Sequence, residues 1–278
     1  MTIDPKYISQ LSDFFMLKQM KIKVKIAITC LVFLWACENK STHHYPSGEV
    51  ESIGYLVDTV KQGEWTYFYK NGNKKSEGSF ADNNMGGEWS NWYENGKIQS
   101  KVNWKNGVYH GEIFEWYENG LGRTESKWEN GLQVGLCNEW YENGNLKSRS
   151  TWKDGKMNGE LLFWCDNGQL SGSGTLEMGK SEGLRTDWYC NGKVKSKTNY
   201  HLGNPVGVYE KWYDNGQLLE QGTYTERGLN GACNVFYPNG QPQFVFTFLN
   251  GLKNGSHTYF DSTGNVLKTE IYEHDTLR

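Results

Sequence analysis

The residues of this chain with the most distinctive chemistry are its six cysteines. A cysteine can carry a lipid, form a disulfide, bind a metal or act as a nucleophile, and its surroundings decide which. Cys30 and Cys37 lie within and directly after an apolar run near the N-terminus. The other four, whose spacings match no zinc motif, lie in the body of the chain and are Cys137, Cys165, Cys190 and Cys233. The cysteines therefore predict no metal site.

Cys37 ends a segment that is organised like an export signal. Met20 is a second possible start, and it is followed by three lysines and by the apolar run 26–36, which is too short to span a bilayer. The sequence Leu34-Trp35-Ala36-Cys37 resembles the lipobox of bacterial lipoproteins, in which the cysteine is lipidated after cleavage before it. The resemblance implies that residues 1–37 are an upstream segment and a lipoprotein signal peptide, with translation starting at Met20 and lipidation at Cys37. An ordinary signal peptide or an uncleaved anchor is the alternative.

Residues 38–52 are polar, and we expect them to form a tether between a membrane and a folded body. His43 and His44 in this segment have no Cys, Asp or Glu at ligand spacing, so no metal is predicted here. The remaining histidines share no spacing and lie beside no nucleophile; they are His110, His201, His257 and His274. We therefore predict no catalytic residue, no cofactor and no enzymatic activity.

The body of the chain repeats every 24 residues. Asn-Gly recurs at this step from 71–72 to 239–240, and Thr263-Gly264 continues the series. A second column of glycines runs at the same step from Gly63 to Gly255. Because Asn and Gly tolerate positive φ, Asn-Gly between short aromatic runs predicts a β-hairpin, with a turn of either two or three residues. About nine such units over residues 53–278 predict an all-β fold, an elongated single-layer antiparallel meander.

Side-chain alternation predicts which columns share a face of this sheet. A Trp column should lie on the more charged face, and a neighbouring Tyr column should point to the other face together with Ile98 and Leu146. With a two-residue turn, Gly87 should lie opposite Trp104 and leave room for its ring. The candidate binding surface is the Trp column with nearby basic residues: Trp92, Trp116, Trp140, Trp164, Trp188, Trp212, Lys147, Arg149, Lys195 and Lys197. The alternative is that these rings only hold the ribbon together.

The same columns suggest how the four cysteines of the body are used. Cys137 and Cys233 occupy one column four repeats apart, which is beyond disulfide reach. Cys165 and Cys190 lie in neighbouring repeats but in adjacent columns, so their side chains should point to opposite faces. We therefore expect all four to be free thiols that pack as small apolar side chains.

The repeat resembles the MORN type of repeat, in a variant that reads Trp/Phe-Tyr-x-Asn-Gly and then Gly-Glu-Trp. The residues that carry the resemblance are Trp92-Tyr93-Glu94-Asn95-Gly96-Lys97-Ile98 and Gly87-Glu88-Trp89. It covers about residues 50–278 and implies a single-layer hairpin ribbon that contacts proteins or lipids, with no catalytic residue. Bacterial proteins of this kind are often grouped with the antitoxins of toxin–antitoxin systems, which implies an antitoxin-like or immunity-like role.

The expected function is a lipid-anchored module of the bacterial cell envelope, on the outer membrane or the periplasmic face, that binds or scaffolds an unidentified protein partner. The alternative is an aromatic repeat protein that binds a cell-wall glycan. Choline-binding modules also have aromatic hairpin repeats, but their unit is shorter than 24 residues. A nucleic-acid partner is not expected, because 29 basic and 32 acidic residues give a net charge of -3 with no basic region.

Overall fold

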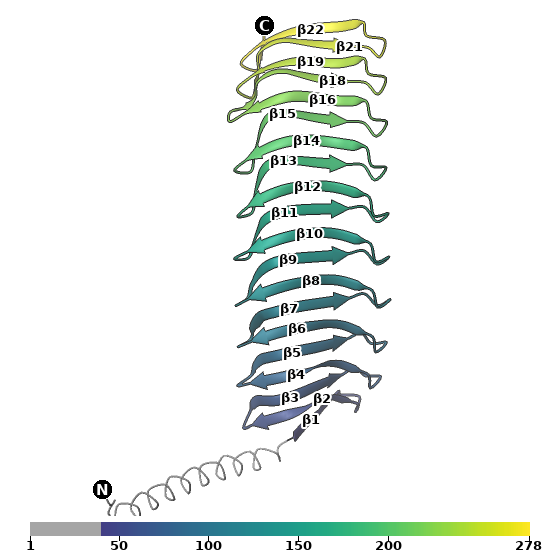
Figure 1. Cartoon of the computed structure of the whole chain (residues 1–278), viewed down its shortest axis with the longest axis vertical. Helices are drawn as coiled ribbons and strands as arrows, with labels where there is room; N and C mark the ends of the chain where they lie inside the picture. Colours follow the sequence, from purple (N-terminus) through teal and green to yellow (C-terminus); the bar gives the residue numbers. More distant parts are fainter. Residues whose placement is uncertain (1–39) are drawn as a thin grey trace, which may run out of the picture.

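The structure, a computed structural model, describes residues 40–278. These residues form one sheet of 23 strands, in which each long strand pairs antiparallel with the strands before and after it in the sequence (Figure 1). The stack is one layer of hairpins along a single long axis, so the predicted all-β meander is confirmed. No helix in residues 40–278 is long and apolar enough to cross a membrane.

The strands follow the 24-residue step, with long strands of eight or nine residues in most repeats. Near the C-terminus, two of these strands are broken into a short and a longer piece, which gives β17 with β18 and β20 with β21. The bounds are β1 Lys40–His44, β2 Val50–Val57, β3 Val60–Phe68, β4 Lys74–Ala81, β5 Asn84–Trp92, β6 Ile98–Lys105, β7 Val108–Trp116, β8 Gly122–Glu129, β9 Leu132–Trp140, β10 Leu146–Lys153, β11 Lys156–Trp164, β12 Leu170–Glu177, β13 Lys180–Trp188, β14 Val194–His201, β15 Asn204–Trp212, β16 Leu218–Thr225, β17 Gly228–Leu229, β18 Gly231–Phe236, β19 Pro242–Leu249, β20 Leu252–Lys253, β21 Gly255–Phe260, β22 Val266–Glu273 and β23 Thr276–Leu277.

The segment expected to be a polar tether, residues 38–52, differs from that expectation. From Lys40 onward it contributes strand β1 and the start of β2, which pair with each other and continue the sheet. The reason is that the repeat pattern extends further than the Asn-Gly series: Tyr45 occupies the position of the Tyr column, and its hydroxyl donates to the Phe68 carbonyl at 2.8 Å. The sheet therefore begins three positions after Cys37 in the sequence.

Each Asn-Gly hairpin closes with three loop residues. In a central repeat, the Gly144 N–H donates to the Tyr141 carbonyl at 2.9 Å, and the Tyr141 N–H donates to the Asn145 carbonyl at 2.9 Å. Gly144 has φ +87°, the left-handed conformation that favours glycine. Of the two turns left open by the sequence, the three-residue turn is therefore the one that forms.

A β-bulge directly after this turn changes which columns share a face. Trp140 pairs with Leu146, but Glu139 pairs with Ser148, so Lys147 is an extra residue on its strand. The same shift pairs Trp92 with Ile98. The prediction that Ile98 and Leu146 lie on the face opposite to the Trp column is therefore wrong, because it assumed unbroken alternation across the turn.

The second glycine column is explained by backbone conformation rather than by ring packing. Gly87 pairs with Trp104 as predicted, since the bulge restores the register of a two-residue turn. However, Gly87 has φ +69°, and a side chain added there would meet nothing within 4 Å. Rings do lie on glycine in another column, where a Cβ at Gly78 would come within 2.3 Å of the Trp89 ring.

A larger irregularity near these glycines bends every repeat in the middle of the chain. Ser150 pairs with Leu161 and Trp152 pairs with Met157, so the three residues around Gly159 oppose a single residue. Such bulges bend the bulged strand and increase its twist. The sheet therefore curls across its width and gains a concave and a convex face.

Tyrosine hydroxyls join each repeat to the next along the Asn-Gly edge. Tyr117 donates to the carbonyl of Trp140 at 2.7 Å, and Tyr141 donates to that of Trp164 at 2.8 Å, in each case 23 residues onward. The same bond recurs from Tyr45, Tyr69, Tyr93, Tyr189, Tyr213 and Tyr237. The Tyr column thus satisfies backbone carbonyls at the ends of the strands.

The asparagine of each Asn-Gly turn acts within its own repeat and on the next one. The Asn143 side chain accepts from the Asn145 N–H at 2.9 Å and donates to the Asp166 carbonyl at 2.7 Å. An aspartate could accept the first bond but could not donate the second. This double role explains why the column holds Asn rather than Asp.

The repeat that lacks a tyrosine in this column has a disulfide instead. Cys165 and Cys190 are bonded, with their Cα atoms 5.8 Å apart, so the prediction that they are free thiols is wrong. Both residues lie beyond the ends of β11 and β13, where strand alternation no longer assigns a face. Cys137 and Cys233 are free and buried, as predicted.

Replacing Asn143 by Asp should destabilise the ribbon by about 0.5–1.5 kcal/mol, because the exposed amide donor to the next repeat is lost and a carboxylate faces a carbonyl. Hydrogen exchange should increase mainly in the repeats on either side of Asn143. The matched control is Asn95→Asp: Asn95 accepts its turn bond, but Lys97 Nζ takes the neighbouring Glu118 carbonyl. Equal losses of unfolding free energy in the two variants would contradict a cross-repeat role for Asn143.

Reduction of Cys165–Cys190 should lower the free energy of unfolding by about 2–4 kcal/mol, the range for loops of this size. The variant Cys165→Tyr/Cys190→Asp restores the residues found in neighbouring repeats, and its Tyr hydroxyl can donate to the Trp188 carbonyl. We expect it to recover part of the loss and to be insensitive to reductant. Urea denaturation with and without dithiothreitol measures both effects. A wild-type denaturation midpoint that reduction does not change would contradict a stabilising role for this disulfide.

Candidate binding groove

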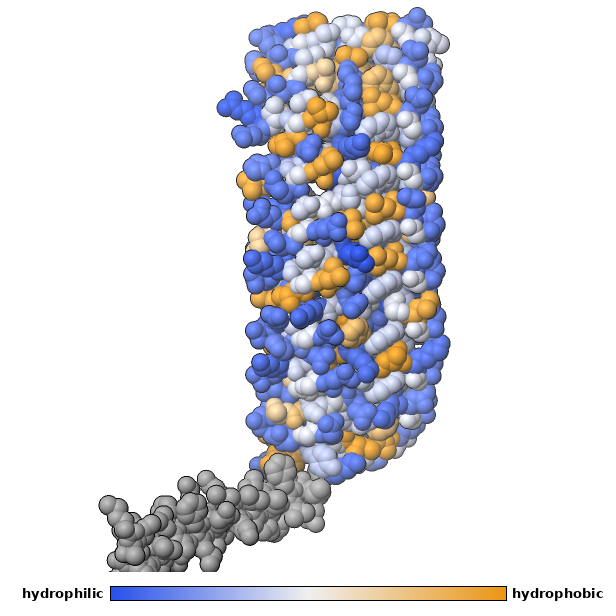
Figure 2. Space-filling model, viewed as in Figure 1, coloured by the Kyte–Doolittle hydropathy of each residue, from blue (hydrophilic) through white to orange (hydrophobic). Residues whose placement is uncertain are grey.

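A groove of about 440 Å³ runs along the concave face between β6 and β11. Its lining comes from both arms of the curled strands, on either side of the bend at the second glycine column. Its volume lies within the range of small-ligand sites in proteins. The space-filling view shows hydrophobic residues recurring along the ribbon between hydrophilic ones, rather than gathered into one core (Figure 2). The groove is therefore the largest hollow described here, and we take it as the candidate site.

Small side chains form the floor of the groove. Cys137 pairs with Ser150, and Ser126 lies on the neighbouring strand opposite Ile113. Ser126, Cys137 and Ser150 are buried, with 5%, 7% and 6% of their surfaces exposed. Ser126 and Ser150 belong to the facing column of the second strand, and Cys137 belongs to the innermost column of the concave face, where its small side chain leaves the space above it open.

Large aromatic residues fill the same column toward both ends of the ribbon. At the N-terminal end, Trp65 and Trp89 are 1% and 3% exposed and lie on Gly54 and Gly78. Tyr209 fills this column near the C-terminal end, and its ring lies 4.9 Å from that of Tyr224. In the middle of the ribbon, Cys137 stands where Trp65, Trp89 and Tyr209 stand toward the ends, so the space above it stays open.

One wall of the groove is aromatic. The rings of Tyr109 and Trp128 lie 5.2 Å apart in an edge-on arrangement. The indole N–H groups of Trp128 and Trp152 donate to Ser126 Oγ at 3.0 Å and to Ser150 Oγ at 2.8 Å. These bonds fix the orientation of the two indoles and leave their faces, rather than their N–H groups, for a ligand.

The opposite wall is polar and carries paired charges. Glu115 lies 3.9 Å from Arg123, and Glu139 lies 3.5 Å from Lys147. Ser148 Oγ donates to Glu139 at 3.2 Å. All four charged side chains are at least one-third exposed, so they remain accessible while neutralising each other.

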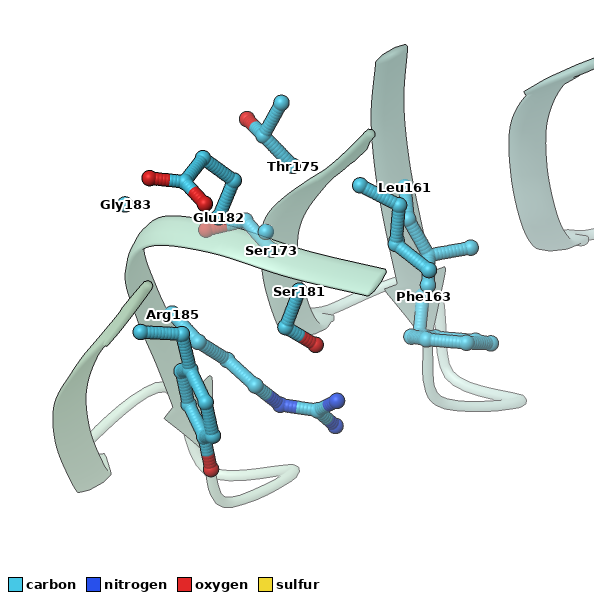
Figure 3. Close-up of a pocket in the computed structure, with 11 residues that line it drawn as sticks. Leu161, Phe163, Ser173, Thr175, Ser181, Glu182, Gly183 and Arg185 are labelled. Carbon is cyan, nitrogen blue, oxygen red and sulfur yellow. The ribbon is translucent and has the colours of Figure 1, made fainter. Parts of the chain in front are cut away.

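A smaller cavity continues the groove toward the C-terminus and shares Leu161 and Phe163 with it. Figure 3 shows Leu161 and Phe163 on one side of this cavity and Glu182 and Arg185 on the other. The Arg185 guanidinium is paired with Asp187 at 3.1 Å. An ion pair on the polar wall therefore recurs two repeats beyond that of Glu139, since Phe163 occupies the column in the repeat between.

The chemistry of the groove is that of a binding site. Burial raises the pKa of the Cys137 thiol, with the nearby Glu139 carboxylate adding to the shift, so the thiol stays protonated and unreactive at neutral pH. Residues 40–278 contain no group of three His, Cys, Asp or Glu side chains arranged to hold a metal ion. Aromatic faces and accessible hydrogen-bonding groups are what the groove offers to a ligand.

The sequence-predicted Trp column lies on the convex face, away from this groove. Trp140 follows Glu139 of the polar wall and so points to the other side of the strand. All six rings of the predicted surface are half-buried, and each is flanked by the next strand's residue, such as Leu146 beside Trp140 or Gly122 beside Trp116. This column packs along the whole ribbon, from Trp92 to Trp116, Trp140, Trp164, Trp188 and Trp212.

The four predicted basic residues do not form one cluster. Arg149 Nε donates to Asn138 Oδ1 at 3.1 Å on the convex face. Lys197 lies over the Trp212 ring at 5.8 Å, and Lys195 lies over the Tyr189 ring at 5.7 Å. Lys147, the bulge residue, contacts Glu139 of the groove. The bulge therefore separates residues that plain alternation placed side by side.

Sequence reasoning missed the groove residues Trp128 and Trp152, although they belong to a visible aromatic column on the second strand of each hairpin. The signal that could have identified the groove is the change of size along the innermost column. In that column Trp65 and Trp89 give way to Ile113 and Cys137, and aromatic residues return at Tyr209.

Five segments of the chain match the family model described as MORN repeat variant: residues 61–82, 85–106, 133–154, 181–201 and 205–226. They are in register with one another, and the intervening hairpins have the same fold and step. The chain is thus a hairpin-repeat protein in which five repeats are similar to the MORN repeat variant.

No curated protein sequence matches the chain significantly. Among solved structures, those titled "Crystal Structure of TcdB2-TccC3" and "Crystal Structure of TcdB2-TccC3-TEV" are similar over 84% of this chain, at 9% and 11% identity and with TM-scores of 0.21 and 0.19. The chain spans only 17% and 15% of the length of those chains.

The effect of the small floor residues on stability can be tested by filling the groove with residues that occupy the same positions in another repeat. The variant Ser126→Gly/Cys137→Trp reproduces the Gly78 and Trp89 arrangement two repeats further on. Burying the added ring should raise the free energy of unfolding by about 1–3 kcal/mol. Ser126→Gly alone is the control, because it leaves the groove open. A double variant less stable than this control would show that the central repeats cannot accept a filled floor.

Proposed function

We propose that this chain is a lipid-anchored binding module of the bacterial cell envelope, with the concave groove as its binding surface. The observation that carries the proposal is the open groove in the middle of a ribbon whose ends are filled by aromatic side chains. Packing alone would be served by large floor residues in every repeat, as at Trp65 and Trp89. Cys137 in place of an aromatic residue, with Ser126 and Ser150 beside it, instead maintains space for a ligand.

The disulfide supports export. Disulfides persist in oxidising compartments such as the bacterial periplasm and are rare in the reducing cytosol. The Cys165–Cys190 bond replaces the tyrosine hydrogen bond of its repeat, so its formation matters to the continuity of the edge. This agrees with the export signal inferred before Cys37.

The position of β1 bears on how the module would sit on a membrane. Lys40 is the first residue of the sheet that the structure describes, and it lies three positions after Cys37 in the sequence. Three extended residues span at most about 10 Å. A lipid on Cys37 would therefore hold the N-terminal end of the ribbon close to the bilayer, with the stack leading away from the attachment point.

The anchor is tested by Cys37→Ser. Expressed in bacteria, the wild-type chain should lose everything before Cys37 and fractionate with membranes, whereas Cys37→Ser should be found in the soluble fraction. One acyl chain holds a protein only marginally, so multiple acylation should be visible in the mass of the mature N-terminus. A Cys37→Ser protein that stays with membranes as the wild type does would disprove anchoring through this residue.

The groove is tested with the soluble Cys37→Ser chain and isolated envelopes. We expect it to be retained on envelopes, retention to be lost in the Ser126→Gly/Cys137→Trp background, and the convex-face variant Trp140→Phe to behave as the parent. Digesting the envelopes with protease or with a peptidoglycan hydrolase then separates the two partner classes, a protein and a cell-wall glycan. Retention that survives closure of the groove would contradict the groove as the binding surface.

A further inference from the structure

The proposed groove has three features that together restrict the class of ligand it can bind. They are a row of indole faces, an opposing row of carboxylates already paired with cations, and a spacing fixed by the repeat. Each restricts the chemistry of the ligand in a different way.

The exposed faces of the indole rings favour a ligand that has a flat apolar surface. Trp128 and Trp152 have their N–H groups bonded to Ser126 and Ser150, so they cannot donate to a ligand without breaking those bonds. What remains is the ring face, which stacks on C–H-rich or aromatic surfaces. A ligand held there needs an apolar face but no acceptor for the indole.

The carboxylates of the polar wall favour a ligand that has hydrogen-bond donors but no net charge. A carboxylate only accepts hydrogen bonds, so Glu115 and Glu139 favour groups that donate to them. Arg123 and Lys147 already neutralise these carboxylates, at 3.9 and 3.5 Å. A cationic ligand would therefore meet a neutralised wall, whereas a neutral polyhydroxyl ligand can donate to the carboxylates and accept from the cations.

The repeat sets the period of these groups. Trp128 and Trp152 are one repeat apart, as are Glu115 and Glu139, and a repeat of two strands advances by about 10 Å. In a β-1,4-linked sugar chain, alternate sugars present the same face, so the chain repeats with each disaccharide, which is close to this length. A polymer of this kind can place an equivalent sugar at each repeat.

An extended polypeptide fits less well. A β-strand presents the same side every two residues, about 7 Å, which falls out of step with the repeat. A polyproline II helix has a turn of about 9 Å and matches the step better. However, a proline-rich chain has few N–H groups, so it can accept from Arg123 and Lys147 but cannot donate to Glu115 and Glu139.

We infer that the groove binds a neutral β-1,4-linked saccharide, with apolar sugar faces on Trp128 and Trp152 and hydroxyls directed to Glu115 and Glu139. The inference rests on the proposed function, since it names the ligand class of the same groove. It makes the cell-wall glycan, rather than a protein, the partner that the groove recognises.

Binding is measured by isothermal titration with the full chain carrying Cys37→Ser. The probe is a β-1,4-linked N-acetylglucosamine hexamer, and the comparison ligands are maltohexaose, which is α-linked, and a proline-rich nonapeptide. We expect the β-linked hexamer to bind, maltohexaose to bind at least about tenfold more weakly, and the peptide not to bind.

The variants take their replacements from the ribbon itself wherever possible. Trp152→Leu copies Leu176, which occupies the same column, and Glu139→Gln removes the charge but keeps the shape. Each should weaken hexamer binding about tenfold, the effect of losing one good contact. Trp140→Phe, which copies Phe236 on the convex face, should leave affinity unchanged. Thermal unfolding of each variant checks that the ribbon is intact.

The possible outcomes separate this inference from the proposed function. Hexamer binding that the groove-closing variant abolishes supports both. Binding of the peptide but not the hexamer, or binding of neither, overturns the saccharide inference; the proposed function then stands or falls on the envelope-retention assay alone. Hexamer binding that persists after the groove is closed, or that Trp140→Phe weakens as much as Trp152→Leu does, overturns the assignment to this groove.

Discussion

The ribbon has a single layer: within residues 40–278 no second sheet or helix covers it, and each hairpin is held by the hairpins before and after it. The backbone ladder supplies part of that hold, and side-chain bonds at the Asn-Gly edge supply the rest. Tyr141 reaches the Trp164 carbonyl and Asn143 reaches the Asp166 carbonyl, so each repeat bonds two carbonyls of the next. A 24-residue step without insertion is what keeps these donors and acceptors aligned.

The disulfide shows how strictly this constraint applies. Where Cys165 replaces the tyrosine of its repeat, the hydrogen bond to the next repeat is lost, and a covalent bond to Cys190 takes over the same connection. The link remains between neighbouring turns even though its chemistry changes. Coupling of each repeat to the next at this edge is thus maintained through the middle of the ribbon.

The bend at the second glycine column gives the same ribbon a site. A flat sheet would expose its innermost column to solvent on one open face, whereas the curled sheet brings Trp152 and Met157 of one arm around to face Ser150 and Leu161 of the other. The concave face can then be filled or left open by the choice of one column of residues. Trp65, Trp89 and Tyr209 fill it, and Cys137 with its small neighbours leaves it open.

The sequence by itself determined the class of fold, the step, the strand order and even the Gly87–Trp104 register, because a turn residue that needs positive φ and an alternating pattern are local properties. It did not determine which columns share a face. The bulge that adds Lys147 to its strand moved Leu146 to the side of Trp140 and separated Lys147 from Arg149. Nor did it determine the Cys165–Cys190 bond, since both residues lie in turns, where alternation has no meaning. The groove also depends on tertiary structure, because its two walls come from arms of the same strands that meet only after the sheet bends, and a bend of this kind is set by how non-adjacent residues pair rather than by any single residue.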